Sequence, residues 1–418
     1  MRPLPFIFLV LAFVGFATGH ELNTLYAPGV GARAMGMGGA FVAMSGDPTC
    51  LFWNPAGCAW VKKPSGYIEG AFEERWQSTL PDYRYYSYYP PSDSPLSYSS
   101  NSTTPRAIAL LVPLKEVVLG FGAFIPYETR LRDGAFTFRN QTVEPRAVGK
   151  IQRISLSIST GKRIGSLPKA SVGFNLNYDR FHYERAGYEH SIYSYSYPWG
   201  SSSSEWVDIN ETQFDDRGFN FDMGALIETE DGLAVGLKMG VASDWEGDGN
   251  TRKYQYYSSH QRDTLRDTAT VQEDLHSGPF KSLVSAPQFL TLGLRISQEK
   301  VSLGAEITVY HRDYPQVYAV TGSDIHIDDP MMFSDWGIPT ARAGIEVQPV
   351  PGLFLRGGSY AFGMDSYYSE THEPACFTAG IGFARQSLSA DLAVEHQSSK
   401  VREKSTRATL GLTYALGK

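Results

Sequence analysis

Residues 301–309 read VSLGAEITV, and this stretch decides the fold class. Every second residue from Val301 to Val309 is apolar, whereas the residues between them, such as Gly304 and Glu306, are small or polar. Successive side chains of a β-strand point to opposite sides, so strict alternation predicts a strand with one apolar and one polar face.

The same alternation recurs along most of the chain after residue 65, in about fourteen segments that are each long enough for a tilted membrane strand. Short turns alternate with long polar loops between them. The even count predicts an all-β fold, a transmembrane antiparallel β-barrel of about 14 strands. The predicted strands are 66–76, 105–113, 116–127, 150–160, 167–182, 217–229, 232–244, 284–298, 299–313, 338–348, 352–364, 374–386, 387–399 and 404–417. The longest predicted loops are 77–104, 128–149, 183–216, 246–283 and 314–337.

Whole-chain averages hide this pattern. The 418 residues carry a net charge of -7 and a mean hydropathy of -0.25, which resemble the values of a soluble protein. A soluble β-sandwich would also alternate, but its strands are shorter, and its polar face is usually rich in Lys and Glu. Here that face is rich in Gly, Ser and Asn, which favours an enclosed lumen. The negative charge argues against nucleic acid as a partner.

The N-terminus has the features of a secretory signal peptide. Arg2 is basic, residues 4–16 are apolar, and Ala17-Thr18-Gly19 is a cleavage site of small residues. The predicted organisation is a signal peptide over 1–19, an N-terminal segment over 20–63 and a barrel over 64–418. This organisation predicts export to the bacterial outer membrane, with membrane lipids around the barrel.

Residues 20–63 do not alternate. They contain the glycine-rich run GARAMGMGGAFVA (31–43) and, further on, WNPAG (53–57). With these motifs the chain resembles the OMPP1/FadL/TodX family of outer-membrane transport proteins. The resemblance implies that the segment forms a hatch, or plug, inside the lumen. The motif residues assigned to the hatch are Gly36, Gly38, Gly39, Asn54, Pro55 and Ala56.

The same resemblance implies passive uptake of hydrophobic compounds, such as long-chain fatty acids, across the outer membrane. Similar N-terminal motifs occur in PorV/PorQ-type barrels, which implies an alternative. In that alternative the protein is a structural or interaction barrel for secretion or surface attachment, and a protein partner binds its extracellular loops.

Four cations are candidates for binding a ligand carboxylate, because they fall on the polar face of their strands: Lys238, Arg295, Arg342 and Arg356. The alternative is a structural role, in which each pairs with an acidic residue such as Glu306, Glu346 or Asp222. Charges in a crowded lumen persist when they are paired.

No catalytic motif of the GxSxG, HExxH or P-loop type occurs, so we expect neither an enzyme nor a cofactor. No His and Cys spacing predicts a metal site. The three cysteines are too few for a disulfide scaffold. Cys50 and Cys58 are close enough in sequence to form a bridge, and two unpaired buried thiols are the equal alternative.

Overall fold

The computed structural model describes twelve stretches of the chain, which are residues 29–79, 96–132, 136–144, 146–163, 169–197, 199–242, 245–263, 267–284, 288–311, 340–362, 375–398 and 403–416. The predicted signal peptide over 1–19 lies outside these described residues. Within them, no helix is long and apolar enough to cross a membrane.

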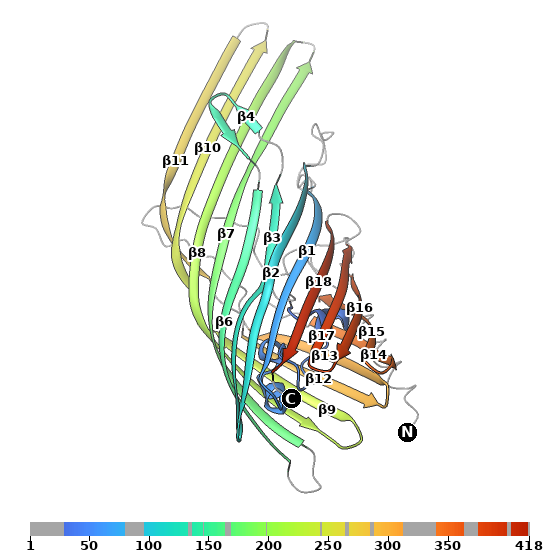
Figure 1. Ribbon diagram of the computed structural model, residues 1–418. Helices are drawn as coiled ribbons and strands as arrows, with labels where there is room; N and C mark the ends of the chain where they lie inside the picture. Colours follow the sequence, from blue (N-terminus) through green and yellow to red (C-terminus); the bar gives the residue numbers. More distant parts are fainter. Residues whose placement is uncertain are drawn as a thin grey trace.

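A closed antiparallel barrel of 14 strands forms the body of the molecule (Figure 1). Strands adjacent in sequence pair around the ring, β1 pairs with β18, and the pairing of β8 with β9 completes the closure. The barrel strands are β1 (Ser65–Thr79), β2 (Leu96–Leu114), β3 (Val117–Arg132), β6 (Arg146–Arg163), β7 (Lys169–Tyr197), β8 (Gly200–Glu228), β9 (Leu233–Ala242), β12 (Gln288–Gln298), β13 (Val301–His311), β14 (Thr340–Val350), β15 (Leu353–Phe362), β16 (Ala375–Arg385), β17 (Leu388–Ser398) and β18 (Glu403–Ala415). The predicted fold class and strand number are confirmed.

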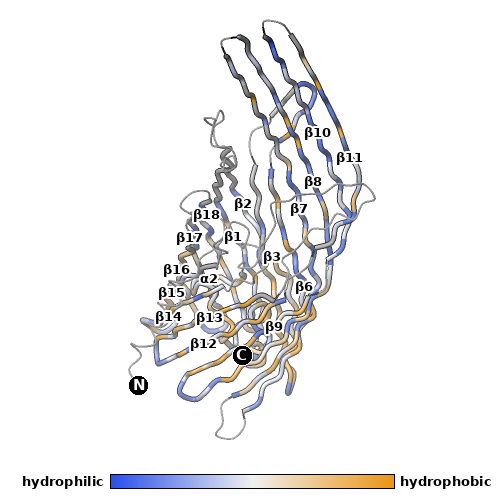
Figure 2. The backbone as a smooth tube through the Cα atoms, turned by 180° about the vertical axis from the view of Figure 1, so that it is seen from behind, coloured by the Kyte–Doolittle hydropathy of each residue, from blue (hydrophilic) through white to orange (hydrophobic). Residues whose placement is uncertain are grey.

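Alternation separates the two faces of the wall as the sequence predicts. On β17, Leu392 and Val394 are exposed, whereas Asp391 and Glu395 are buried. On β13, Val309 is exposed and Glu306 is 5% exposed. The tube in Figure 2 shows hydrophobic residues concentrated in the barrel. An outward band of exposed apolar side chains is what a barrel presents to lipid.

Four strands extend well beyond the barrel as one curved sheet, called the extension below (Figure 1). The far halves of β7 and β8 pair with each other, and β8 also pairs with β10 (Trp245–Asp263), which pairs with β11 (Asp267–Val284). A small hairpin of β4 (Phe136–Phe138) and β5 (Gln141–Val143) lies against it. On this hairpin, Arg139 stacks on Tyr256 of β10 at 4.1 Å from the ring centroid.

The extension corrects two loop predictions. Residues 183–216 and 246–283 were expected to be polar loops, but they are mostly strand. Their polarity does not prevent strand formation, because ladder hydrogen bonds join backbones, and a few apolar side chains such as Val207, Ile209 and Tyr254 are enough to form a small buried cluster on the extension. Polar composition was therefore a poor guide to the ends of β7 and β8.

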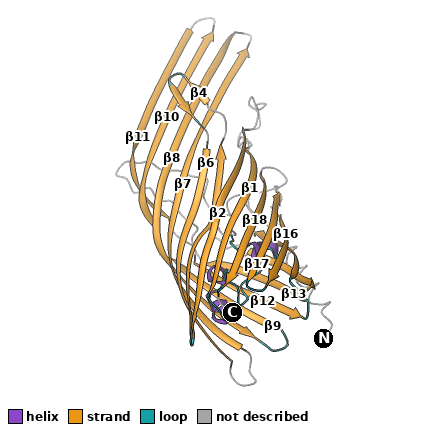
Figure 3. Ribbon diagram, viewed as in Figure 1, coloured by secondary structure: helices purple, strands orange, loops and turns teal. Residues whose placement is uncertain are grey.

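Residues 29–63, called the inner segment below, lie within the ring of strands (Figure 3). The segment contains helix α2 (Ala32–Gly36), helix α3 (Cys50–Trp53) and the 3-10 helix η2 (Pro55–Trp60). Phe41 and Leu51 are fully buried. Its polar contacts reach β1, β8, β13 and β16, which lie on different sides of the barrel. The inner segment is therefore anchored all around the wall.

Candidate functional site

The inner segment lies against glycines of the wall. A Cβ atom added to Gly236 would lie 2.2 Å from the carbonyl oxygen of Val42, and one added to Gly344 would lie 2.2 Å from that of Met37. Any side chain at these positions would push the segment inward. Glycines of the same kind are found on several strands: Gly173, Gly224, Gly236, Gly344 and Gly358. The glycine-rich polar face predicted for the strands therefore accommodates the inner segment.

Asn54 joins two arms of the inner segment to the wall. Its side chain is completely buried, and its Nδ2 donates to the carbonyl oxygens of Val42 at 2.8 Å and of Ala225 on β8 at 3.2 Å. Its Oδ1 accepts from the backbone N–H of Ala56 at 3.1 Å, which caps η2 with Pro55 in the first turn. The motif Asn54-Pro55-Ala56 therefore fixes how the chain turns toward β1.

The glycine run makes a tight turn against the opposite wall. Gly38 and Gly39 have positive φ angles of 63° and 73°, which suit glycine best. The N–H of Gly38 donates to Thr378 Oγ1 at 3.0 Å, and that hydroxyl donates to the carbonyl oxygen of Gly36 at 3.2 Å. All six motif residues assigned to the hatch therefore lie in the inner segment, at its contacts with the wall.

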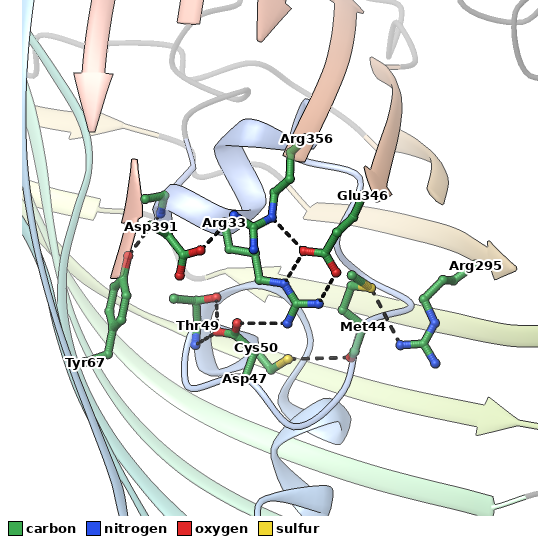
Figure 4. A network of polar contacts seen from close by, with 11 residues as sticks. Arg33, Met44, Asp47, Thr49, Cys50, Tyr67, Arg295, Glu346, Arg356 and Asp391 are labelled. Carbon is green, nitrogen blue, oxygen red and sulfur yellow. Dashed lines mark hydrogen bonds and ion pairs between the residues drawn. The ribbon is translucent and has the colours of Figure 1, made fainter. Parts of the chain in front are cut away.

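A charged cluster holds the N-terminal part of the inner segment (Figure 4). Arg33 makes a bidentate pair with Glu346 of β14, with distances of 2.9 Å from Nε and 2.7 Å from Nη2. Arg356 donates to the same carboxylate at 2.6 Å and to Asp391 at 2.7 Å. Two guanidinium groups thus share Glu346, and Arg33 also reaches Asp47 at 3.4 Å. The network links the inner segment to three wall strands.

The four candidate cations are brought to the lumen, and each has a carboxylate partner. Lys238 pairs with Asp222 at 3.3 Å and Arg295 with Glu228 at 2.9 Å. Arg342 pairs with Glu306 at 2.7 Å, and Arg356 belongs to the cluster with Glu346. This geometry agrees with the alternative stated in the sequence analysis, in which each cation has a structural role and pairs with an acidic residue.

Three of these cations also touch the inner segment. Lys238 donates to the carbonyl oxygen of Phe52 at 2.8 Å, and Arg295 contacts Met44 Sδ at 3.6 Å. Arg342 lies over the ring of Trp53 at 5.1 Å from its centroid. The cations therefore work as anchors between wall and inner segment.

Strands β2 and β3 separate along part of their length. Their pairs run from Leu114–Val117 to Ala107–Phe124, and the next described pair is Ser99–Arg132. No described pair joins residues 100–106 to residues 125–131, and these two stretches are called the β2–β3 gap below. Pro126, which has no N–H, lies at a register shift against β6 in the same region. The wall therefore has a backbone discontinuity beside the inner segment.

Arg106 borders this gap and was not among the residues selected from the sequence. It is 3% exposed, and its Nη2 donates to the carbonyl oxygens of Pro126 at 2.8 Å and of Gly29 at 3.3 Å. Among the described residues, no carboxylate lies within ion-pair distance of it. A signal in the sequence is Pro105, which is unusual inside a strand and marks a bulge.

An aromatic cluster lies where the extension leaves the barrel. It comprises Phe181, Tyr183, Phe214, Trp245 and Phe280, all at most 6% exposed. Tyr183 and Phe214 are 4.9 Å apart between ring centroids, and Phe181 and Trp245 are 5.9 Å apart. Trp245 Nε1 is buried and has no hydrogen-bond partner among the described residues. Phe181 and Tyr183 continue the inward row of Asn177 and Asp179, so the cluster faces the lumen side.

The cysteines are buried free thiols. Of the two equal expectations for Cys50 and Cys58, the unpaired one is found. Cys50 donates to the carbonyl oxygen of Met44 at 3.5 Å. Burial, followed by the carboxylate of Asp47, raises the pKa of Cys50 to about 12.

Comparison with known proteins gives similarity in structure only. No family model matches the sequence. No curated protein matches it either. Among solved structures, the CymD monoaromatic hydrocarbon channel is 14% identical with a TM-score of 0.62, and the match covers 93% of this chain and 98% of CymD. The P. putida toluene transporter TodX is 13% identical with a TM-score of 0.61, over 94% of this chain and 100% of TodX.

A Pseudomonas aeruginosa FadL homologue is 14% identical with a TM-score of 0.61, over 93% of this chain and 99% of that homologue. The chain has the fold of the FadL- and TodX-type channels. At this level of identity the likeness concerns the fold. The strand pattern of the sequence agrees with this fold.

Proposed function

We propose that this protein is a passive outer-membrane channel for hydrophobic compounds. The observation that carries the proposal is the aromatic cluster on the lumen side of the extension, next to a lumen that holds the inner segment. Water-exposed strands that lead to buried aromatic rings offer an apolar site for a compound arriving from outside. The band of exposed apolar side chains supports a place in a lipid bilayer, and the FadL-type fold supports the outer membrane.

The proposed path has three steps. A hydrophobic compound binds at the aromatic cluster, moves past the inner segment, and leaves sideways through the β2–β3 gap or into the periplasm. In this mechanism the segment over 20–63 acts as a hatch, which must shift from its glycine seats. Diffusion down a concentration gradient drives the flux, because nothing in the sequence resembles a nucleotide site.

The substrate class is narrowed by the charges. Long-chain fatty acids remain a proposed substrate, and they need a cation for their carboxylate. Lys238, Arg295, Arg342 and Arg356 could serve only by exchanging a wall carboxylate for the ligand. Since such an exchange is costly in an enclosed site, the geometry favours neutral hydrocarbons, the compounds carried by the channels of similar fold.

The second candidate is the interaction barrel. It is favoured by the extension, in which β11 is an edge strand with exposed Val271 and Leu275. An edge strand presents unpaired backbone groups to which another chain can add. We rank this reading second, because it gives no role to the buried aromatic cluster.

A deletion strain tests the proposal. Uptake of labelled toluene and labelled oleate is measured in cells with and without the protein. The two strains are chosen to contain equal amounts of an unrelated porin. The proposal predicts a lower rate for at least one compound on deletion, restored by the wild-type gene and insensitive to an uncoupler. Unchanged uptake of both, together with a co-purifying secretion or surface protein, would establish the interaction barrel instead.

A further inference from the structure

Arg106 occupies an unusual position in its strand. Against β1, Glu69 pairs with Ala107 and Gly70 pairs with Pro105, so Arg106 is the extra residue of a β-bulge. Bulges redirect side chains, and they are common beside functional sites. Here the redirected side chain is buried, and it lies at the point where β2 stops pairing with β3.

The guanidinium group joins two parts of the protein that differ in function. Nη2 donates to Pro126 on the β3 side of the gap and to Gly29 at the start of the inner segment. One nitrogen atom therefore holds both acceptors. A shift of either carbonyl group changes the position that the guanidinium can take toward the other.

The surrounding carboxylates are engaged elsewhere. Glu73 and Glu395 pair with Arg407 at 3.2 Å and 3.4 Å. Glu69 accepts the N–H of Gly31 at 2.6 Å and the hydroxyl of Tyr67. Among the described residues the direct hydrogen bonds of Arg106 are thus to two backbone carbonyls, one in the inner segment and one at the gap, while Glu69, Glu73 and Glu395 act on its charge from beyond ion-pair distance.

We infer that Arg106 is a positioning residue that couples the inner segment to the β2–β3 gap. When the inner segment shifts at Gly29, Arg106 loses one of its two acceptors, its guanidinium gains freedom to move, and its hydrogen bond to Pro126 at the β3 edge weakens. The hatch and the wall would then loosen together. The link to transport rests on the proposed function, whereas the coupling itself is a property of the protein without substrate.

A double-mutant cycle tests the coupling. G29A perturbs the inner segment, because a Cβ there would lie 2.6 Å from the ring of Trp53 and 2.7 Å from Met35 Sδ. R106Q removes the charged link. Hydrogen exchange, followed by mass spectrometry on the barrel in detergent, is measured over residues 29–39 and 127–131.

G29A is expected to speed exchange at 127–131 several-fold in the wild-type background and to add nothing in the R106Q background. R106Q alone is expected to speed exchange in both regions. R252Q is the control, since it removes an arginine on β10 of the extension whose ion pair is to Glu211, and it should leave both regions unchanged.

Independent effects give the opposite result. If G29A speeds exchange at 29–39 but leaves 127–131 as in wild type, or if its effect there is equally large with R106Q, the coupling is wrong. Heat-modifiable gel migration shows whether R106Q forms a folded barrel. If R106Q does not fold, the coupling is tested by G29A in the wild-type background and by R106K. R106K keeps the charge without the guanidinium and should give intermediate exchange at 127–131. Uptake is measured in a separate assay. If the transport proposal fails there, the hydrogen-exchange experiment still tests the coupling.

Discussion

Replacing Asn54 by alanine should release the inner segment while the barrel stays intact. The substitution removes three hydrogen bonds, from Nδ2 to Val42 and to Ala225, and from Ala56 to Oδ1. Each is worth about 1 kcal/mol net, so the seated state should lose about 3 kcal/mol. Since about 1.4 kcal/mol is a factor of ten, the unseated population should rise about a hundredfold.

Hydrogen exchange measures this population. The amides of Met35 and Gly39 are bonded to Gly31 and Ala34 within the inner segment, so they exchange only when it opens. In N54A their exchange should be roughly a hundredfold faster, while amides of β16 and β17 keep wild-type rates. Figure 3 shows that the helices of the inner segment are separate from the ladder of wall strands.

N220A is the matched control, because Asn220 is a buried asparagine whose Nδ2 bonds to Asp179 on the wall. It should not change exchange in the inner segment. Wild-type exchange of Met35 and Gly39 in N54A would refute the reasoning, since it would mean that the Asn54 hydrogen bonds do not hold the segment in place. Equal acceleration throughout the barrel would refute it as well.

Three more predictions follow from the site. In E346Q, Arg33 and Arg356 lose the charge of their shared carboxylate. Because one partner of a buried pair is removed, the free energy for opening the inner segment should fall by about 3 kcal/mol, measured by hydrogen exchange of the Met35 and Gly39 amides. An unchanged exchange rate would contradict the anchoring role. Burial raises the pKa of Cys50 to about 12, so at pH 8 Cys50 is a protonated thiol. It should resist alkylation by iodoacetamide in the folded barrel and react after denaturation. Rapid labelling of the native protein would contradict its burial. F214A opens the aromatic cluster. It should raise the half-saturating concentration for uptake several-fold, with little change in the maximal rate. A lower maximal rate alone would show that Phe214 acts after the capture step.

The sequence specifies the barrel well because each strand obeys a local rule. The period-two pattern of residues 301–309 identifies β13, and its two faces are as predicted. The same rule fails for β10 and β11, because their few buried side chains, such as Trp245, Tyr254 and Phe280, are separated by long polar stretches and do not form an alternating apolar row. β10 pairs with β8, which is distant in sequence, and β11 pairs only with β10 among the described strands.

The site shows the same limit. The motif Asn54-Pro55-Ala56 could be selected because it stands outside the strand pattern. The role of Lys238 was ambiguous, because Asp222, its partner, is identified only by the register of neighbouring strands. Arg106 was missed, because its importance depends on a bulge and on a gap between β2 and β3, and neither follows from the composition of one strand.

Photolabelling tests the central claim most directly. A small hydrophobic compound that carries a diazirine is added to the barrel in lipid vesicles, and the labelled positions are mapped by mass spectrometry. The account predicts labels on the aromatic cluster around Phe181 and Phe214, on the inner segment and beside the β2–β3 gap, all reduced by excess toluene. Labels confined to the outward lipid-facing residues, with no competition, would contradict a path for hydrophobic compounds through this barrel.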